Sequence, residues 1–227
     1  MAPFTGPYAP FLRVLGFKRW ALNQQMCRVC VRDLERHSGG AEVPVSLVYV
    51  DVRGSTEIAE RMSASEFSDG LRRYLSLVGA AVDQEHGVID HMAGDGVMAM
   101  WIPGFVGRQH PKRAVKAAIQ IARSIEAAVD AGEGFPAGVG VHTGEAYVGV
   151  VGDTGSRDFT VVGDTANTTA RLSAAAAPGE VVLSGAAVAA TDADTSTLER
   201  RSLVLKGKAE PFEAWVWKVS DPVPLEV

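Results

Sequence analysis

The chain has 227 residues, which is enough for one domain with a full hydrophobic core. No apolar run approaches the roughly 20 residues that a membrane-spanning helix needs, and no secretion signal is visible. The net charge is −5, and an acidic domain binds nucleic acid poorly because that binding depends on Lys and Arg neutralising phosphates. We therefore expect a cytoplasmic protein with no transmembrane segment and no nucleic-acid partner.

The N-terminal residues differ from the rest in charge and composition. Residues 1–41 hold six Lys/Arg and two Asp/Glu, and Phe11 to about His37 contains no proline and one glycine. This composition predicts a helical segment at 1–41, followed by a main domain at 42–220 and a tail at 221–227. Within the N-terminal segment, Cys27 and Cys30 are separated by two residues, which favours two thiols in a helix, with a zinc site shared by two copies as the alternative.

The main domain alternates between strand and helix patterns. Strands are predicted at Val45–Val52, Val88–Met92, Val97–Ile102, Phe159–Val162, Val181–Leu183, Ser202–Leu205 and Phe212–Val219, with two more inside Ala137–Val151 that turn at Thr143–Glu145. Helices are predicted from a capping box at Ser63 towards Glu85, from Pro111 to about Gly132, from Thr165 to Ala177, and from Ser184 onwards. This order predicts a mixed α+β sheet with helices packed on it.

Two strands each deliver an aspartate into a glycine-containing turn. Asp51 ends the first strand, and Asp95 lies between Gly94 and Gly96, where Asp-Gly between apolar runs is typical of a hairpin. If these strands are neighbours, the two carboxylates meet at one end of the sheet and repel each other. Divalent cations such as Mg²⁺ would remove that repulsion and leave positions open for substrate phosphates. The alternative is that Asp51 only caps a helix near Ser55 and Asp95 is only a turn residue.

A second group of polar residues follows Gly163. Asn167 and Arg171 are four residues apart on a predicted helix, so their side chains leave the same face. An amide and a guanidinium so placed can hold a ribose and a phosphate, because the guanidinium fork donates in pairs. Lys206, between two strands, offers a further positive charge for phosphate. Taken singly, each also fits an ordinary surface role.

Together these residues make the chain resemble the class III nucleotidyl cyclases, the catalytic domain of adenylate and guanylate cyclases. The resemblance covers about residues 43–219. It implies a ferredoxin-like core and a head-to-tail homodimer whose active sites lie between protomers. The motifs are Val50–Thr56, Gly94–Ala99, Val162–Leu172 and Leu205–Lys208.

The resemblance also implies a role for each motif. Asp51 and Asp95, with the backbone carbonyl of Val52, would hold two Mg²⁺ or Mn²⁺ ions per site. Asn167 and Arg171 from the opposite protomer would stabilise the transition state. The remaining implied role is phosphate binding, by Gly54, Ser55, Thr56 and Lys206. The implied reaction is attack of the ribose 3′-hydroxyl on the α-phosphorus of a nucleoside triphosphate, with pyrophosphate leaving.

Two positions read the base in this family, and the first of them differs here from the usual pattern. His91 stands where adenylate cyclases usually have lysine, and Thr160 stands at the second position. Both side chains can donate or accept hydrogen bonds, so the pair could satisfy adenine and lacks the acidic residue that guanine-selective members tend to use. ATP is the favoured substrate. Another base (UTP, CTP or GTP) and a catalytically weak regulatory homologue remain as alternatives.

Overall fold

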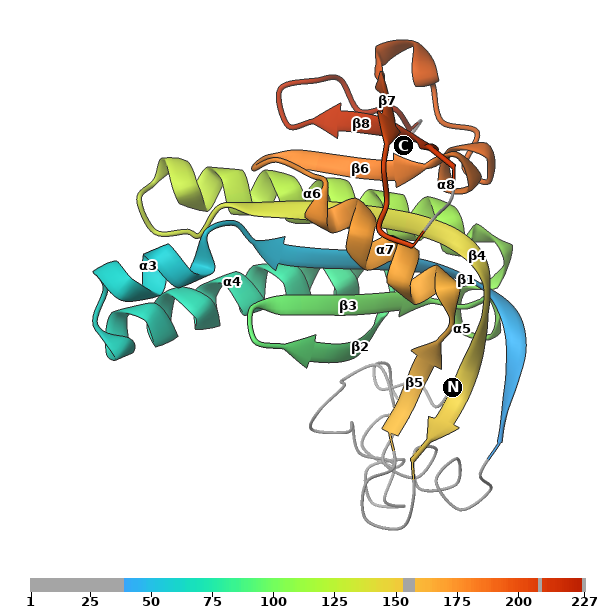
Figure 1. Ribbon diagram of the computed structural model, residues 1–227, viewed down its shortest axis with the longest axis horizontal. Helices are drawn as coiled ribbons and strands as arrows, with labels where there is room; N and C mark the ends of the chain where they lie inside the picture. The colour runs from blue at the N-terminus through green and yellow to red at the C-terminus, as the bar shows by residue number, and fades with distance from the viewer. Residues whose placement is uncertain (1–38, 153–157, 208–209, 226–227) are drawn as a thin grey trace, which may run out of the picture.

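The computed structural model describes residues 39–152, 158–207 and 210–225. In this part of the chain, eight strands form one sheet in the order β2-β3-β1-β4-β6-β8-β7, with β5 paired to β4 (Figure 1). The strands are β1 (Gly40–Val52), β2 (Val88–Ala93), β3 (Gly96–Trp101), β4 (Ala137–Val151), β5 (Asp158–Val162), β6 (Glu180–Ser184), β7 (Glu199–Leu203) and β8 (Phe212–Lys218). The helices are α3 (Ser55–Arg61), α4 (Ala64–Gln84), α5 (Pro103–Val106), α6 (His110–Asp130), α7 (Asp164–Ala174) and α8 (Gly185–Ala189), with short 3₁₀ turns η1 (Gly107–Gln109) and η2 (Thr195–Thr197).

The first half of the sheet is a ferredoxin-like unit. Strand β1 lies between β3 and β4 and is antiparallel to both, and β2 closes the edge against β3. Helix α4 connects β1 to β2, and α6 connects β3 to β4. The parallel pairing of β4 with β6 makes the whole sheet mixed. The predicted α+β fold with a ferredoxin-like core is therefore confirmed.

Strand β1 sends alternate side chains to two different faces of this sheet. Val48, Val50 and Val52 join the large core under α4 and α6, whereas Val45 and Leu47 join a second apolar cluster on the other face. This is the period of two that an extended strand imposes. Residues with odd numbers on β1, Asp51 among them, consequently belong to the face away from α4 and α6.

The predicted helix starts at Ser63 and Ser184 are confirmed. The Ser63 hydroxyl accepts a hydrogen bond from the Glu66 amide, and the Glu66 carboxylate accepts one from the Ser63 amide, so both halves of the capping box are present. The Ser184 hydroxyl accepts from the Ala187 amide at the start of α8. The following helices are thus positioned by their own first turns.

The prediction of two strands within Ala137–Val151 is wrong. These residues form the single strand β4, paired with β1 in unbroken register from Gly40 opposite Gly149 to Val52 opposite Ala137. Gly144 does not form a turn but allows α7 to approach β4 closely. A Cβ at this position would lie 2.9 Å from Thr165 Oγ1 at the start of α7. The Thr165 hydroxyl donates to the Glu145 carbonyl.

The strand predicted at Ser202–Leu205 lies instead at Glu199–Leu203 (β7). Three of the five residues of β7 are charged, so the strand lacks the apolar pattern from which strands were predicted. Arg201 makes two ion pairs, with Glu180 on β6 at 2.9 Å and with Glu199 at 2.8 Å. These contacts stabilise a sheet edge that has little apolar surface of its own.

The predicted N-terminal helical segment, with Cys27 and Cys30, lies outside the described residues apart from its last three. Residue 40, inside that predicted segment, already belongs to β1. Among the described residues, none of the helices has both the length and the apolar character required to cross a bilayer.

His110 is expected to make the free energy of unfolding depend on pH. Its ring is buried at the start of α6, and its Nδ1 lies 2.9 Å from the Ser46 hydroxyl, which also contacts Thr143 Oγ1 at 2.7 Å. Burial lowers the pKa of His110. The unfolded chain therefore takes up a proton below about pH 6.5 that the folded chain excludes, and stability falls as pH decreases, by at most about 1.4 kcal/mol per pH unit from this residue.

Replacing His110 with glutamine should flatten this part of the profile, because glutamine retains hydrogen-bonding capacity and does not titrate. Urea unfolding followed by circular dichroism between about pH 5 and about pH 7.5 measures the slope. An unchanged slope in His110→Gln would show that His110 does not contribute.

Candidate active site

Asp51 and Asp95 come together at one end of the sheet. Asp51 follows Val50, which pairs with Val97 on β3, and Asp95 lies in the turn just before β3. Burial raises the pKa of Asp51, the nearby Asp95 charge raises it further, and Arg53 opposes both. The neighbouring strands thus bring the two carboxylates close enough for the charge of Asp95 to act on Asp51.

These carboxylates fit a hard divalent cation. Oxygen ligands suit Mg²⁺ and Mn²⁺, and a cation between the two groups would relieve the repulsion that raises the pKa of Asp51. No cluster of three or more His, Cys, Asp or Glu side chains suitable for a metal occurs in the described ranges. The remaining ligands would therefore be backbone oxygen, such as that of Val52 at the end of β1, and oxygens of the substrate.

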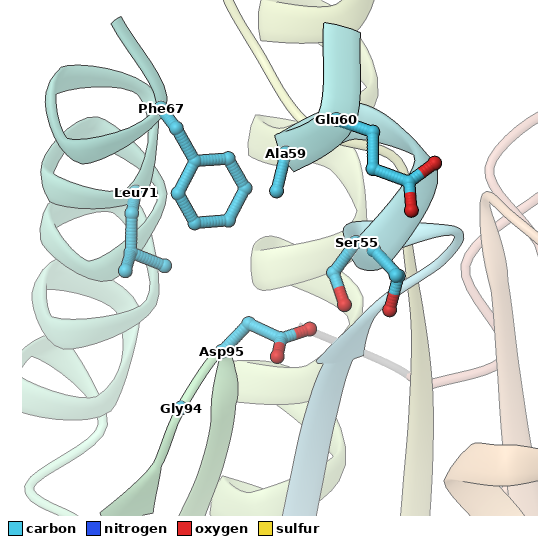
Figure 2. Close-up of a pocket in the computed structure, with 8 residues that line it drawn as sticks. Ser55, Ala59, Glu60, Phe67, Leu71, Gly94 and Asp95 are labelled. Atoms are coloured by element: carbon cyan, nitrogen blue, oxygen red, sulfur yellow. The ribbon is translucent and has the colours of Figure 1, made fainter. Parts of the chain in front are cut away.

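A pocket of about 470 Å³ opens beside Asp95. Figure 2 shows that the Asp95 carboxylate comes from the β2–β3 turn, that Ser55 and Glu60 come from α3, and that Phe67 comes from α4. One side of the pocket is polar and the other is apolar. The lining residues are Ser55, Thr56, Ala59, Glu60, Phe67, Leu71, Gly94 and Asp95. The predicted phosphate-binding residues Ser55 and Thr56 thus share a pocket with a predicted metal ligand.

Gly54 sets the direction in which the chain leaves β1 for this pocket. Its φ of 67° and ψ of 31° are left-handed, a conformation that glycine adopts without steric cost. Helix α3 begins directly after it and has no side-chain cap. The short connection keeps Ser55 and Thr56 within a few residues of Asp51.

Arg53 was not predicted as a site residue. Its Nη1 donates to Asp51 Oδ2 at 3.3 Å, and its Nη2 donates to the carbonyl and, at 3.3 Å, to the hydroxyl of Ser173 on α7. Its Nε is buried with no hydrogen-bond partner among the described residues. Arg53 therefore connects the first carboxylate to the helix that carries Asn167 and Arg171.

Two tyrosines near the carboxylates were also missed. Tyr49 precedes Asp51 by two residues on the same face of β1, and burial, Asp51 and Asp95 raise its pKa. Tyr74 on α4 is buried, its pKa is raised mainly by burial, and its hydroxyl has no partner within the described part of the chain. The period of two on β1 could have identified Tyr49, whereas nothing in the local sequence marks Tyr74.

The predicted site residues on α7 make no direct contact with the carboxylates that the described part of the structure records as a hydrogen bond or ion pair. Asn167 is exposed and Arg171 half-buried, and across the described ranges neither forms a hydrogen bond or ion pair with Asp51 or Asp95. Arg171 instead lies against Gly207, where a Cβ would be 3.5 Å from Nη2. The exposed Lys206 is the residue immediately before Gly207. The structure thus brings Arg171 and the Lys206 turn together.

The two residues predicted to read the base lie on strands joined by Asp90. His91 on β2 is exposed, and its Nδ1 is 2.6 Å from Asp90 Oδ2. The other oxygen, Oδ1, accepts a hydrogen bond of 3.1 Å from the backbone amide of Val161 on β5, the residue after half-buried Thr160. Strands β2 and β5 are therefore connected at this point.

Comparison with known proteins adds a family match. The family model described as "Adenylate and Guanylate cyclase catalytic domain" matches residues 40–218. The chain is 30% identical over 168 residues to "Adenylate cyclase" of Anabaena cylindrica, covering 69% of this chain and 32% of that protein. It is 31% identical to "Adenylate cyclase 1" of Rhizobium meliloti, covering 60% and 22%. The chain thus spans about a third or less of these two relatives.

Solved structures of similar fold include cyclases of both base preferences. The guanylyl cyclase Cya2 has a TM-score of 0.73 at 24% identity, and the match covers 83% of this chain and 100% of that chain. The adenylyl cyclase CyaB from P. aeruginosa has a TM-score of 0.73 at 22% identity, with the same coverage. At these identities the likeness concerns the fold alone.

Proposed function

The chain belongs to the family of adenylate and guanylate cyclase catalytic domains, and we propose that it converts ATP to 3′,5′-cyclic AMP and pyrophosphate. The observation that carries this proposal is the meeting of Asp51 and Asp95 beside a pocket lined by Ser55 and Thr56. Two carboxylates and neighbouring hydroxyls suit a triphosphate with divalent cations. The assignment of each residue below is part of the proposal.

Asp51 and Asp95, with the carbonyl of Val52, hold two Mg²⁺ or Mn²⁺ ions. Bound there, such ions supply the charge that lowers the pKa of the ribose 3′-hydroxyl and balances the triphosphate. The chain from Gly54 to Thr56 binds the phosphates beside them. Arg53 keeps Asp51 oriented through the 3.3 Å contact between the guanidinium and the carboxylate.

Asn167 orients the ribose, and Arg171 donates to the α-phosphorus oxygens as the 3′-oxygen attacks and pyrophosphate leaves. A planar guanidinium can follow this change in geometry with two parallel hydrogen bonds. Lys206, beside Arg171 through the Gly207 contact, adds positive charge for the distal phosphates. In the head-to-tail dimer that the family resemblance implies, a second copy of the chain supplies Asn167 and Arg171 to each site.

A head-to-tail homodimer is the proposed assembly. Large apolar side chains are exposed on three neighbouring strands: Met92 on β2 at 50%, Val151 on β4 at 40% and Val162 on β5 at 47%. Burying such side chains against another copy is favourable. These strands also carry His91 and Thr160, so the same association would enclose the base.

ATP is favoured because the curated relatives from Anabaena cylindrica and Rhizobium meliloti are named adenylate cyclases. The presence of His91 at the base-reading position keeps GTP, UTP and CTP as alternative substrates, since histidine can donate or accept.

Product identification tests the proposal directly. The full chain is incubated with each nucleoside triphosphate in turn, with Mg²⁺ and then Mn²⁺, and the products are identified by chromatography and mass spectrometry. The proposal predicts cyclic AMP and pyrophosphate from ATP. A preference for another nucleotide would identify a different substrate. The absence of product from all four nucleotides would favour a regulatory homologue without turnover.

A further inference from the structure

Asp90 is a buried carboxylate that the proposed reaction does not use. Its side chain is 0% exposed, whereas that of its neighbour His91 is 46% exposed. The two oxygens have different partners on different strands: Oδ2 contacts His91 Nδ1 on β2, and Oδ1 accepts from the Val161 amide on β5. A buried carboxylate needs such partners. One of them is His91 itself, and the other follows Thr160, the second position assigned to base recognition.

This arrangement determines the tautomer of His91. A carboxylate only accepts hydrogen bonds, so the contact of 2.6 Å requires that Nδ1 carry a hydrogen. The other ring nitrogen, Nε2, is then left for a ligand. It accepts a hydrogen bond when the ring is neutral and donates one when the ring is protonated.

Adenine and guanine differ at the atom that such a group would read. On the Watson–Crick edge, N1 of adenine is an acceptor, whereas N1 of guanine carries a hydrogen and is a donor. We propose that Asp90 sets the hydrogen-bonding character of His91, so that the protonated ring selects adenine and the neutral ring selects guanine. The proposal rests on the proposed function, in which His91 contacts the base.

The charges around His91 favour its protonated ring. The hydrogen bond to Asp90 raises the pKa of His91, burial lowers it, and the charges of Asp90 and of Asp158 on β5 raise it. The residue paired with His91 on β3 is the uncharged Met98. The net effect is a raised pKa, so the protonated ring of His91 persists to higher pH than that of a free histidine.

The kinetic test compares kcat/KM for ATP with kcat/KM for GTP as pH rises from about 6 to about 8.5. Effects common to both nucleotides, such as titration of the phosphates or the metal ligands, cancel in the ratio. The ATP-to-GTP ratio should fall by at least about tenfold, because adenine loses its donor and guanine gains its acceptor. A ratio that does not change with pH would overturn the proposal.

Asp90→Asn provides a sharp contrast. The amide oxygen must still accept from the Val161 amide, so the NH₂ group faces His91 and requires Nδ1 to accept. The neutral ring then carries its hydrogen on Nε2 and donates at all these pH values, and the ratio should stay in favour of ATP. His91→Lys, a permanent donor in this range, should give the same flat profile.

A readout without turnover separates this inference from the proposed function. Two-bond ¹H–¹⁵N spectra of the full chain, assigned with His91→Gln, report which ring nitrogen carries hydrogen. Wild type should show the Nδ1–H form and Asp90→Asn the Nε2–H form at high pH. If both proteins show the same ring form, the role of Asp90 is overturned even when cyclase activity is found. If the ring form changes as expected but no nucleotide is turned over, only the proposed function is refuted.

Discussion

Replacing Asp51 with asparagine is expected to reduce cyclase turnover by at least about 10²- to 10³-fold, with the fold retained. Asparagine has nearly the same shape but lacks the charge that a divalent cation needs. The side chain lies at the end of β1, where it is half-buried and shares its surroundings with Asp95. Asp95→Asn should have a loss of similar size, since both carboxylates belong to one site.

The measurement is initial rate with saturating ATP under Mg²⁺ and Mn²⁺, together with thermal unfolding. Asp130→Asn is the matched control, because Asp130 is an exposed carboxylate at the end of α6. Removing the repulsion between Asp51 and Asp95 should leave stability unchanged or raise it slightly. Turnover by Asp51→Asn within about threefold of wild type would show that the carboxylate pair does not serve catalysis.

Replacing Arg171 with alanine is expected to lower kcat by about 10²- to 10³-fold with little change in KM. This pattern follows if the guanidinium binds the reacting phosphorus in the transition state more strongly than in the bound substrate. Arg171→Lys should recover little, because an ammonium cannot donate two parallel hydrogen bonds. Steady-state kinetics with ATP, for both variants, measures the two constants.

Arg200→Lys is the control for this series. Arg200 is a surface arginine with 70% of its side chain exposed, paired with Glu213 on β8, so kcat and KM should both be retained. A KM effect without a kcat effect in Arg171→Ala would instead assign Arg171 to ground-state binding of phosphate.

The parts of the fold that local sequence determines could be predicted. The Asp95 hairpin follows from Asp-Gly between apolar runs, and the start of α4 follows from the Ser63 capping box. Strand β4 could not be predicted as one element, because Thr143-Gly144-Glu145 resembles a turn until α7 is packed against Gly144. Tertiary packing decided the conformation there.

The contacts that position the site residues could not be predicted from the local sequence for a similar reason. Arg53 reaches Ser173 across 120 residues of sequence, and Asp90 reaches Val161 across 71. No periodicity records such pairs, since each depends on strands and helices that meet only in the folded sheet. The site residues taken from motifs were visible in the sequence, whereas the residues that orient them became visible in the structure.

The most direct test of a site divided between two copies is to mix two inactive variants. Asp51→Ala lacks the carboxylate side of the site, and Asn167→Ala lacks the helix side. In an equal mixture of freely exchanging dimers, half are mixed and each mixed dimer has one complete site, so about a quarter of wild-type sites should be restored. Activity in the mixture at about this level, with each variant inactive alone, is the predicted result. A mixture no more active than the two variants separately, beside an active wild type, would contradict the shared site.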